Sequence, residues 1–189
     1  MGDILERLPA KVYTYVMHQD DPKKCTSAKM CRMRLATPIY RLHHIHPKMV
    51  VLDPTSTKIF TPKEDVSCGI LIIDCSWQKV GEVFMQKIRG RRVRLPLLIA
   101  ANPVHYGHIG VLSSLEAAAA ALYLISEREQ AENMLKIYKW GPNFLLLNKH
   151  LLDAYLEAGS EEDILEVEKK IFRVGRERVK ADLVEAPKR

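Results

Sequence analysis

Residues 94–117, RLPLLIAANPVHYGHIGVLSSLEA, form the stretch that decides the fold. An apolar run over residues 95–101 ends at Asn102-Pro103, and a Tyr-Gly pair follows at 106–107. Ser113-Ser114 then open an alanine-rich segment that is typical of a helix. We predict a buried strand, an irregular loop and a helix N-terminus in succession, because an ordinary connection would not need both dipeptides. Such units build nucleotide-like ligand sites at the C-terminal ends of parallel strands.

Upstream of this stretch, strand-like and helix-like segments alternate. Residues 69–73, GILII, are a continuous apolar run, as expected of a strand that is buried on both faces. Strands separated by helices of this length predict βαβ units and a parallel sheet. The predicted strands cover residues 11–17, 49–52, 69–73 and 93–101, and the predicted helices between them cover 26–36 and 77–88.

Downstream, the pattern is helical only. The breaks fall at Gly141-Pro142 and Gly159-Ser160, and Ser160 with Asp163 fits the looser form of the capping box. The predicted helices cover residues 113–126, 127–138, 143–158 and 161–184. We therefore predict an α/β fold: a parallel sheet with flanking helices over residues 1–99, an all-helical half over 100–189, and a ligand cleft between them.

Composition excludes several classes of protein. The 189 residues are 47% apolar, which is enough for a proper core. No apolar run approaches the length of a membrane span and residues 1–16 lack a secretion signal, so we expect a cytoplasmic protein without a membrane partner. The four cysteines form no CxxC pair, and the HHIH run at 43–46 has no carboxylate or cysteine at ligand spacing. We therefore expect reduced thiols and no metal.

The net charge of +6 is concentrated in two blocks. Clustered Lys and Arg are what binding to a phosphate backbone requires, because counterion release supplies much of that affinity. This favours a nucleic acid as partner; the alternative is a solvated basic face that only aids solubility. The first block is Lys23, Lys24, Lys29, Arg32 and Arg34, and the second is Lys87, Arg89, Arg91, Arg92 and Arg94.

The candidate chemistry depends on Asp74 and Trp77, both of which follow the GILII strand. Asp74 follows that strand at the sheet edge where parallel sheets place function. It could bind a ribose hydroxyl, act as a base, or cap the helix that begins near Trp77, a role for which Ser76 competes. Trp77 could be ordinary core, or the wall of a pocket for a cationic ligand such as a sulfonium.

Helix starts supply candidate anion contacts. Thr26 and Ser27 head the first helix, and Ser113-Ser114 head the alanine-rich one. Their backbone amides suit a carboxylate or phosphate, while plain N-capping is the alternative. Leu97, Leu98 and Leu112 would give apolar walls and backbone groups for an adenine, although composition does not name the ligand.

Taken in order, several motifs resemble the small-subunit ribosomal RNA aminocarboxypropyltransferases, a ribosome-biogenesis family of archaea and eukaryotes. The one departure is His105, where that family's pattern has Asn, and the chain is most similar to an archaeal-type member without the acidic tail of eukaryotic ones. The matching elements are Asp21-Pro22-Lys23-Lys24-Cys25-Thr26-Ser27-Ala28-Lys29, Leu52-Asp53-Pro54, Asp74-Cys75-Ser76-Trp77, Arg94-Leu95-Pro96, Ala100-Ala101-Asn102-Pro103-Val104, Tyr106-Gly107, Leu112-Ser113 with Glu116-Ala117, and Trp140-Gly141 with Phe144 and Asn148.

The resemblance implies a function. S-adenosyl-L-methionine would be the cofactor, and its 3-amino-3-carboxypropyl group would move to the imide nitrogen of a uracil-type base in small-subunit rRNA, within a pre-ribosomal particle. Methylthioadenosine would be released. The implied fold is like that of the SPOUT methyltransferases, with a trefoil knot, and we expect a monomer.

The resemblance also implies roles for individual residues. Asp74 would be the general base or an orienting carboxylate, and Trp77 would cover the methyl group. The remaining cofactor contacts would come from Thr26, Ser67, Ile73, Leu97, Leu98, Tyr106, Leu112, Ser113 and Ser114. The rRNA phosphates would be held by Lys23, Lys24, Lys29, Arg32, Lys87, Arg89, Arg91 and Arg92.

Two alternatives remain open on the sequence alone. A SPOUT-type rRNA methyltransferase would use the same cofactor and RNA but transfer the methyl group. A non-catalytic rRNA-binding assembly factor would need neither the Asp74–Trp77 motif nor the Asn102–Tyr106 loop.

Overall fold

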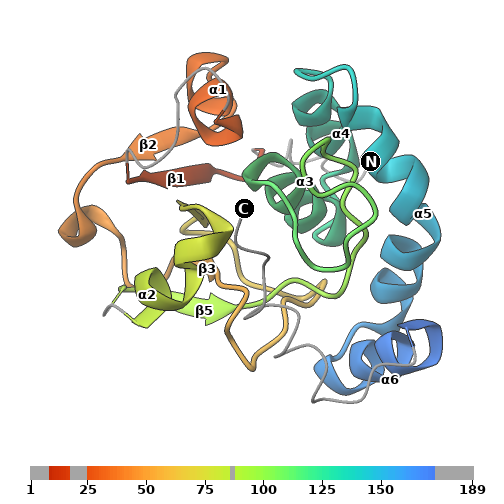
Figure 1. Ribbon diagram of the computed structural model, residues 1–189. Coiled ribbons are helices and arrows are strands. Elements are labelled where there is room, and N and C mark those ends of the chain that lie inside the picture. Colours follow the sequence, from red (N-terminus) through yellow and green to blue (C-terminus); the bar gives the residue numbers. More distant parts are fainter. Residues whose placement is uncertain (1–8, 18–24, 86–87, 173–189) are drawn as a thin grey trace, which may run out of the picture.

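A five-stranded parallel sheet organises the chain (Figure 1). The computed structural model describes residues 9–17, 25–85 and 88–172, and its strands lie in the order β2-β1-β4-β3-β5. The strands are β1 (Val12–Val16), β2 (Thr37–Ile39), β3 (Val50–Leu52), β4 (Ile70–Asp74) and β5 (Arg91–Val93). The predicted parallel sheet is confirmed. β2 was not predicted, because it is a three-residue edge strand that contains Pro38, a residue tolerated mainly at sheet edges.

Six α-helices accompany the sheet in the described residues. They are α1 (Thr26–Arg32), α2 (Val80–Met85), α3 (Ser114–Leu124), α4 (Arg128–Leu135), α5 (Gly141–Ala158) and α6 (Glu161–Phe172). Single 3-10 turns span Leu42–His44 and Trp77–Lys79. Ser160 and Asp163 make the expected cap at the start of α6, since the Ser160 hydroxyl accepts a hydrogen bond from the Asp163 N–H at 3.2 Å.

The central strand β4 is buried on both faces, as its unbroken apolar sequence predicts. Alternate residues point to opposite faces of a strand. Ile70 and Ile72 therefore join the core under α3 to α6, whereas Leu71 and Ile73 join a second core with Phe84 of α2. Asp74 ends this strand and pairs in register with Val16 at the end of β1.

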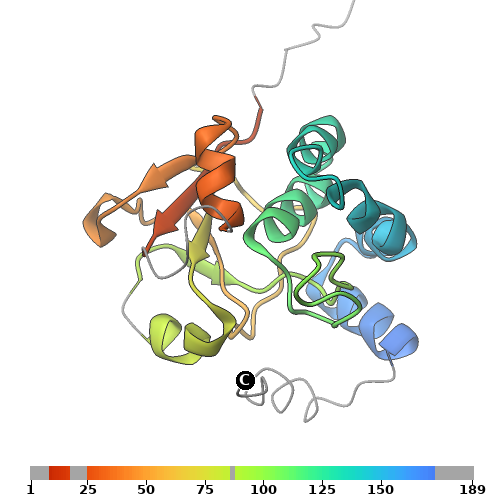
Figure 2. The same ribbon diagram turned by 45° about the horizontal axis from the view of Figure 1, so that its top comes forward.

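Helix α3 lies at the centre of the molecule, in contact with β4, α1, α4 and α5. Its sequence is apolar on every side, and every residue from Leu115 to Leu124 except Ala117 is buried. The run of alanines keeps the helix surface narrow, which lets the neighbouring elements approach it closely. In the tilted view, α3 lies between the sheet and the other C-terminal helices (Figure 2).

The predicted strand over residues 93–101 is wrong beyond Val93. After β5 the chain makes only isolated bridges, Arg94 with Ile59 and Ile99 with Ile109. Residues 95–101 are apolar and lead from the sheet to the C-terminal helices. Side chains of α5 and α6 bind the backbone of residues 97–99, and backbone groups of residues 107–110 bind that of residues 98 and 100. Leu98, Ala100 and Ala101 are buried in the main core and Leu95 and Ile99 pack against it, which is why the stretch has the composition of a strand.

The main core contains side chains from both predicted halves. Val50 and Ile72 of the sheet belong to the same buried cluster as Leu115, Phe144 and Ile164 of the C-terminal helices. The division of the chain into residues 1–99 and 100–189 stays a prediction. None of the described helices is long and apolar enough to span a bilayer.

Candidate functional site

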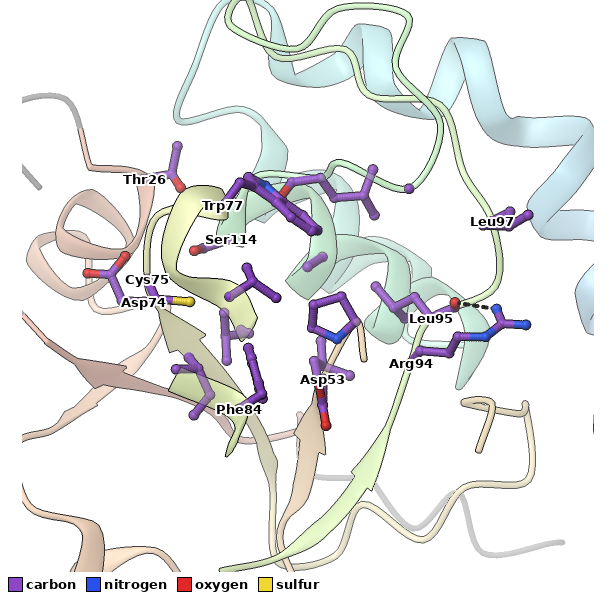
Figure 3. A pocket seen from close by; sticks show the side chains of 18 of the residues that line it. Thr26, Asp53, Asp74, Cys75, Trp77, Phe84, Arg94, Leu95, Leu97 and Ser114 are labelled. Carbon is purple, nitrogen blue, oxygen red and sulfur yellow. Dashed lines mark hydrogen bonds between the residues drawn. The ribbon is translucent and has the colours of Figure 1, made fainter. Parts of the chain in front are cut away.

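A cavity of about 450 Å³ lies at the carboxyl ends of β3 and β4 (Figure 3). This volume is within the range of small-molecule sites. The walls come from segments far apart in the sequence, including the first turns of α1 and α3, residues 94–97 and Phe172 at the end of α6. Of the predicted cofactor residues, the cavity is lined by Thr26, Ile73, Asp74, Trp77, Leu97, Leu112 and Ser114.

Four predicted cofactor residues do not line the cavity. Ser67 is exposed on the loop that precedes β4, at the opposite end of that strand from Asp74. The Leu98 side chain is fully buried in the core, and its carbonyl accepts a hydrogen bond from the Gly110 N–H at 2.8 Å. Tyr106 is 63% exposed on the loop after Asn102. Ser113 is occupied as a helix cap.

Asp74 is held by a cysteine that the sequence analysis did not select. The Cys25 thiol donates toward both carboxylate oxygens of Asp74, at 3.3 Å each. The same sulfur caps α1 by accepting the Ala28 N–H at 3.3 Å. Burial, with the Asp74 charge beside it, raises the pKa of the Cys25 thiol to about 11. The thiol is therefore protonated at neutral pH, when it can serve as a hydrogen-bond donor to the carboxylate.

Trp77 is fixed across the cavity by its indole nitrogen. The Nε1–H donates to the Leu112 carbonyl at 3.0 Å, which joins the 3-10 turn after β4 to the segment before α3. The indole ring itself lines the cavity (Figure 3). Trp77 thus lines the cavity and also packs against the second core, and its predicted role toward the methyl group stays a prediction. The Leu112 carbonyl, which was expected to contact the adenine, therefore accepts a hydrogen bond from the Trp77 indole.

Glu116 anchors the loop that leads into the site. It is fully buried and forms a capping box with Ser113, whose N–H and hydroxyl both donate to it at 2.7 Å. The other carboxylate contacts are the Ala101 N–H at 2.6 Å and the backbone and side-chain amides of Asn102 at 2.9 and 2.7 Å. Ser113 therefore caps α3, and its predicted contact with the cofactor stays a prediction.

Side chains of α5 and α6 bind the backbone of residues 97–99. Glu168 accepts the Leu97 N–H at 2.8 Å, and the Tyr155 hydroxyl donates to the Leu97 carbonyl at 2.8 Å. Asn148, which is fully buried, accepts from the Ile99 N–H and donates to its carbonyl. Buried backbone groups need partners, and here helix side chains replace the missing strand.

Much of the second basic block is used inside the protein. Arg92 donates to the buried carboxylate of Asp53 at 2.6 Å, and Arg94 makes a two-pronged pair with Glu168 at 2.8 and 2.9 Å. Arg91 pairs with Glu64 but keeps half of its side chain exposed. Arg89 is exposed. Lys87 lies outside the described residues.

In the first basic block, Lys29 is also committed to a structural contact. Its ammonium donates to the Ile137 carbonyl at 2.6 Å and lies 3.8 Å from the centre of the Tyr138 ring. Arg32 is exposed at the end of α1. Lys23 and Lys24 lie outside the described residues. Among the described members of the predicted RNA contacts, Arg32, Arg89 and Arg91 are therefore the exposed ones.

Sequence reasoning did not select many of the residues that line the cavity, among them Cys25, Asp53, Arg94 and Phe172. Cys25 and Asp53 belong to motifs that were recognised, DPKKC and LDP; in the first motif the neighbouring Lys24 and Thr26 were selected instead, and in the second no residue was selected. Arg94 was assigned to a basic block, and Phe172 had no local signal because it comes from a distant helix. Among the described residues, no group of three or more His, Cys, Asp or Glu side chains could hold a metal ion.

The lining combines apolar walls with a few polar groups at one edge of the sheet. Leu97, Leu112 and Trp77 are suited to a planar apolar group, while the carboxylate of Asp74 is suited to a cationic or hydroxyl-bearing partner. Ser114, in the first turn of α3, provides a helix N-terminus toward an anion. The arrangement fits an amphipathic ligand that carries both charges.

Comparison with known proteins gives consistent results. Residues 50–172 match a family model described as ribosome biogenesis protein, C-terminal. A protein of Vulcanisaeta distributa named 16S rRNA aminocarboxypropyltransferase is 41% identical over 165 residues, covering 84% of this chain and 89% of its own length. A Methanosarcina acetivorans protein of the same name is 39% identical over 159 residues, covering 83% and 91%.

A solved structure shares the fold. It is described as the SAM-dependent rRNA:acp-transferase Tsr3 from Vulcanisaeta distributa, and it superposes with a TM-score of 0.84. The superposition covers 94% of this chain and 99% of the other, at 36% sequence identity. The observed α/β architecture is therefore that of the solved relative.

Proposed function

Because the chain belongs to the 16S rRNA aminocarboxypropyltransferase family, we propose that it is an enzyme that modifies small-subunit rRNA from S-adenosyl-L-methionine. The group transferred is the 3-amino-3-carboxypropyl group, and the acceptor is the imide nitrogen of a uracil-type base. The observation that carries the proposal is the cavity at the end of β4, which both Asp74 and Trp77 line.

The residues of this cavity fit the cofactor. A volume of about 450 Å³ accommodates a nucleoside with an amino-acid arm. Leu97 and Leu112 form apolar walls for the adenine. Ile73 and Asp53, which also line the cavity at the ends of β4 and β3, are assigned to the ribose. The first turns of α1 and α3, at Thr26 and Ser114, suit the amino-acid carboxylate.

The chemistry is a displacement at carbon. When bound, the cofactor supplies a carbon activated by a sulfonium, with methylthioadenosine as the leaving group. Trp77 covers the side of the site assigned to the methyl group, and its bond to Leu112 holds the ring there. Asp74 accepts the imide proton or orients the imide as the new N–C bond forms, and Cys25 holds that carboxylate in place.

An experiment with two differently labelled forms of the cofactor tests the function. The enzyme is incubated with unmodified 16S rRNA transcript and S-adenosylmethionine labelled either in the methyl carbon or in the carboxypropyl carbons. Label is expected in RNA from the carboxypropyl carbons only. Label from the methyl carbon would make the protein a methyltransferase, and no label with intact RNA binding would make it an assembly factor.

The finer points of the fold and setting are further proposals. We propose a SPOUT-type trefoil knot, supported by the return of the chain from edge strand β5 through residues 94–113 to α3, which packs on β4. Stretching the denatured chain by its ends tests this, since a knot shortens its final length. We also propose a cytoplasmic monomer that acts on a pre-ribosomal particle without a metal, to be tested by sedimentation and by activity in chelator.

A further inference from the structure

The loop over residues 102–110 exposes large apolar side chains beside the cavity. Val104 is 81% exposed, Tyr106 63% and Ile109 45%. Three such residues thus fall within six positions of one loop. Exposed apolar side chains that lie together often mark a site of interaction with a partner. The proposed cofactor cavity does not use Val104 or Tyr106, since neither lines it.

This loop is held in one conformation by its own backbone. The Gly107 N–H donates to the Ala100 carbonyl at 2.8 Å, and the Ala100 N–H donates to the His108 carbonyl at 2.9 Å. The Asn102 side chain accepts the His105 N–H at 3.0 Å while its amide binds buried Glu116. A surface ordered in this way loses little conformational entropy when a partner binds.

The loop is also continuous with the reaction site. Ile109 and Gly110 line the cavity, and Glu116 links Asn102 to the helix start that contributes Ser114. A partner that reaches the cavity from this side therefore touches the loop. Under the proposed function that partner is an rRNA strand, whose target base must leave its stack to enter the site.

The chemistry of the loop suits unpaired bases more than phosphates. No acidic residue occurs from 102 to 115, so an RNA strand meets no negative side chain there. The loop offers one Tyr and two His rings, and His105 and His108 lie 5.9 Å apart edge to face. Burial, with His108 nearby, lowers the pKa of His105 and favours its neutral form. Sequence-specific RNA recognition relies on such rings for stacking.

We propose that residues 102–110 form a base-stacking surface for single-stranded rRNA at the mouth of the cavity, an inference that rests on the proposed function. Tyr106 stacks on a base next to the target nucleotide, and Val104 packs between neighbouring bases. The loop thereby holds open the strand from which the target base is extruded.

Binding measurements with variants test this surface. Tyr106→Ala is expected to weaken binding of an unmodified 16S rRNA transcript roughly five- to hundred-fold, the effect of losing one base–aromatic stack. Tyr106→Phe should bind like wild type, because stacking needs the ring and not the hydroxyl. The slope of affinity against salt should stay unchanged, because no phosphate contact is lost. Val104→Ser should also weaken binding of the transcript, whereas its matched control Leu146→Ser, at a 76% exposed residue of α5, should bind like wild type.

A second measurement does not depend on affinity. A transcript with 5-iodouridine in place of uridine should cross-link on irradiation to the peptide that contains Tyr106. Unchanged RNA affinity in Tyr106→Ala, together with no cross-link, would overturn the proposal. A loss confined to S-adenosylmethionine affinity would overturn it by assigning the loop to the cofactor. Failure of wild type to transfer label while the variants still lose RNA affinity would refute the proposed function alone.

Discussion

The Cys25 sulfur lies 3.3 Å from each of the two carboxylate oxygens of Asp74, across 49 residues of sequence. The contact joins the start of α1 to the end of β4 within the cavity wall. A neutral donor in this position orients the carboxylate without neutralising its charge. Asp74 can therefore remain an acceptor for a proton while its direction is fixed.

Replacing this thiol should separate capping from orientation. Cys25→Ala removes the cap of α1 and the donor to Asp74, and should lower the free energy of unfolding by about 1–2 kcal/mol. It should also lower kcat for aminocarboxypropyl transfer. Cys25→Ser keeps a donor and a cap, so it should restore most of both. Denaturant melts and single-turnover rates measure the two effects, and equal activity in all three proteins would rule out an orienting role.

The same thiol predicts a change in stability at alkaline pH. Its pKa is raised from 9.0 in the unfolded chain to about 11 in the folded protein. The folded state therefore retains a proton that the unfolded state loses, so this contribution is complete below pH 9 and declines as pH rises toward 11. The loss is on the order of 2 kcal/mol. Between pH 8 and pH 11 the free energy of unfolding should fall more steeply for wild type than for Cys25→Ser. Parallel curves of free energy against pH would contradict this.

Substitutions of Trp77 should grade the affinity for S-adenosylmethionine. Trp77→Phe keeps an aromatic wall but loses the bond to Leu112, which corresponds to a weakening of roughly two- to tenfold. Trp77→Ala also loses the ring face and should bind about ten- to hundredfold more weakly. Calorimetry measures both. Trp140→Phe, whose ring stacks on Tyr138, is the control and should bind as wild type does.

Glu116→Gln should disturb the site without touching a ligand. The carboxylate accepts hydrogen bonds from Ala101, Asn102 and Ser113, and an amide nitrogen in its place would face some of these donors. We expect a loss of about 2–4 kcal/mol in the free energy of unfolding and weaker cofactor binding. Glu157→Gln, on the exposed side of α5, should leave both unchanged. A Glu116→Gln protein with wild-type stability would refute the anchoring role.

Substitution of two arginines in the second basic block should affect different properties: Arg92→Ala should affect stability, and Arg89→Ala should affect RNA binding. Arg92→Ala leaves the buried Asp53 carboxylate without its guanidinium partner, and should lower the free energy of unfolding by about 3–5 kcal/mol. Arg89→Ala should leave stability intact and reduce the salt slope of RNA binding by about one. Thermal melts and titrations at several salt concentrations decide. An unchanged slope would assign Arg89 to a solvated surface.

The sequence predicted the parts of the fold that depend on local pattern. β4 and α3 were clear because a continuous apolar run and a capped alanine-rich helix have recognisable composition. The segment 95–101 was misassigned because several of its backbone partners are side chains far away in sequence: Asn148, Tyr155 and Glu168, which are 49 to 71 positions away. Local periodicity does not register a hydrogen bond to a distant side chain.

For the candidate site too, the residues with a local sequence signal were predicted and those without one were not. Asp74 and Trp77 were found because they directly follow a recognisable strand, and both line the cavity. Ser113 was assigned to the ligand because a serine at a helix start can either cap the helix or contact an anion. Glu116, three residues later, completes the capping-box pattern and already favoured the cap. Cys25 was missed because nothing near it in sequence indicates that α1 begins beside the end of β4.

Because Asn148, Tyr155 and Glu168 bind the backbone of residues 97–99, one wall of the cavity is assembled only after the last described helices have docked. A nascent chain that has completed its sheet but not α6 lacks the groups that shape this wall. Competence to bind cofactor is therefore a late event in the life of the molecule.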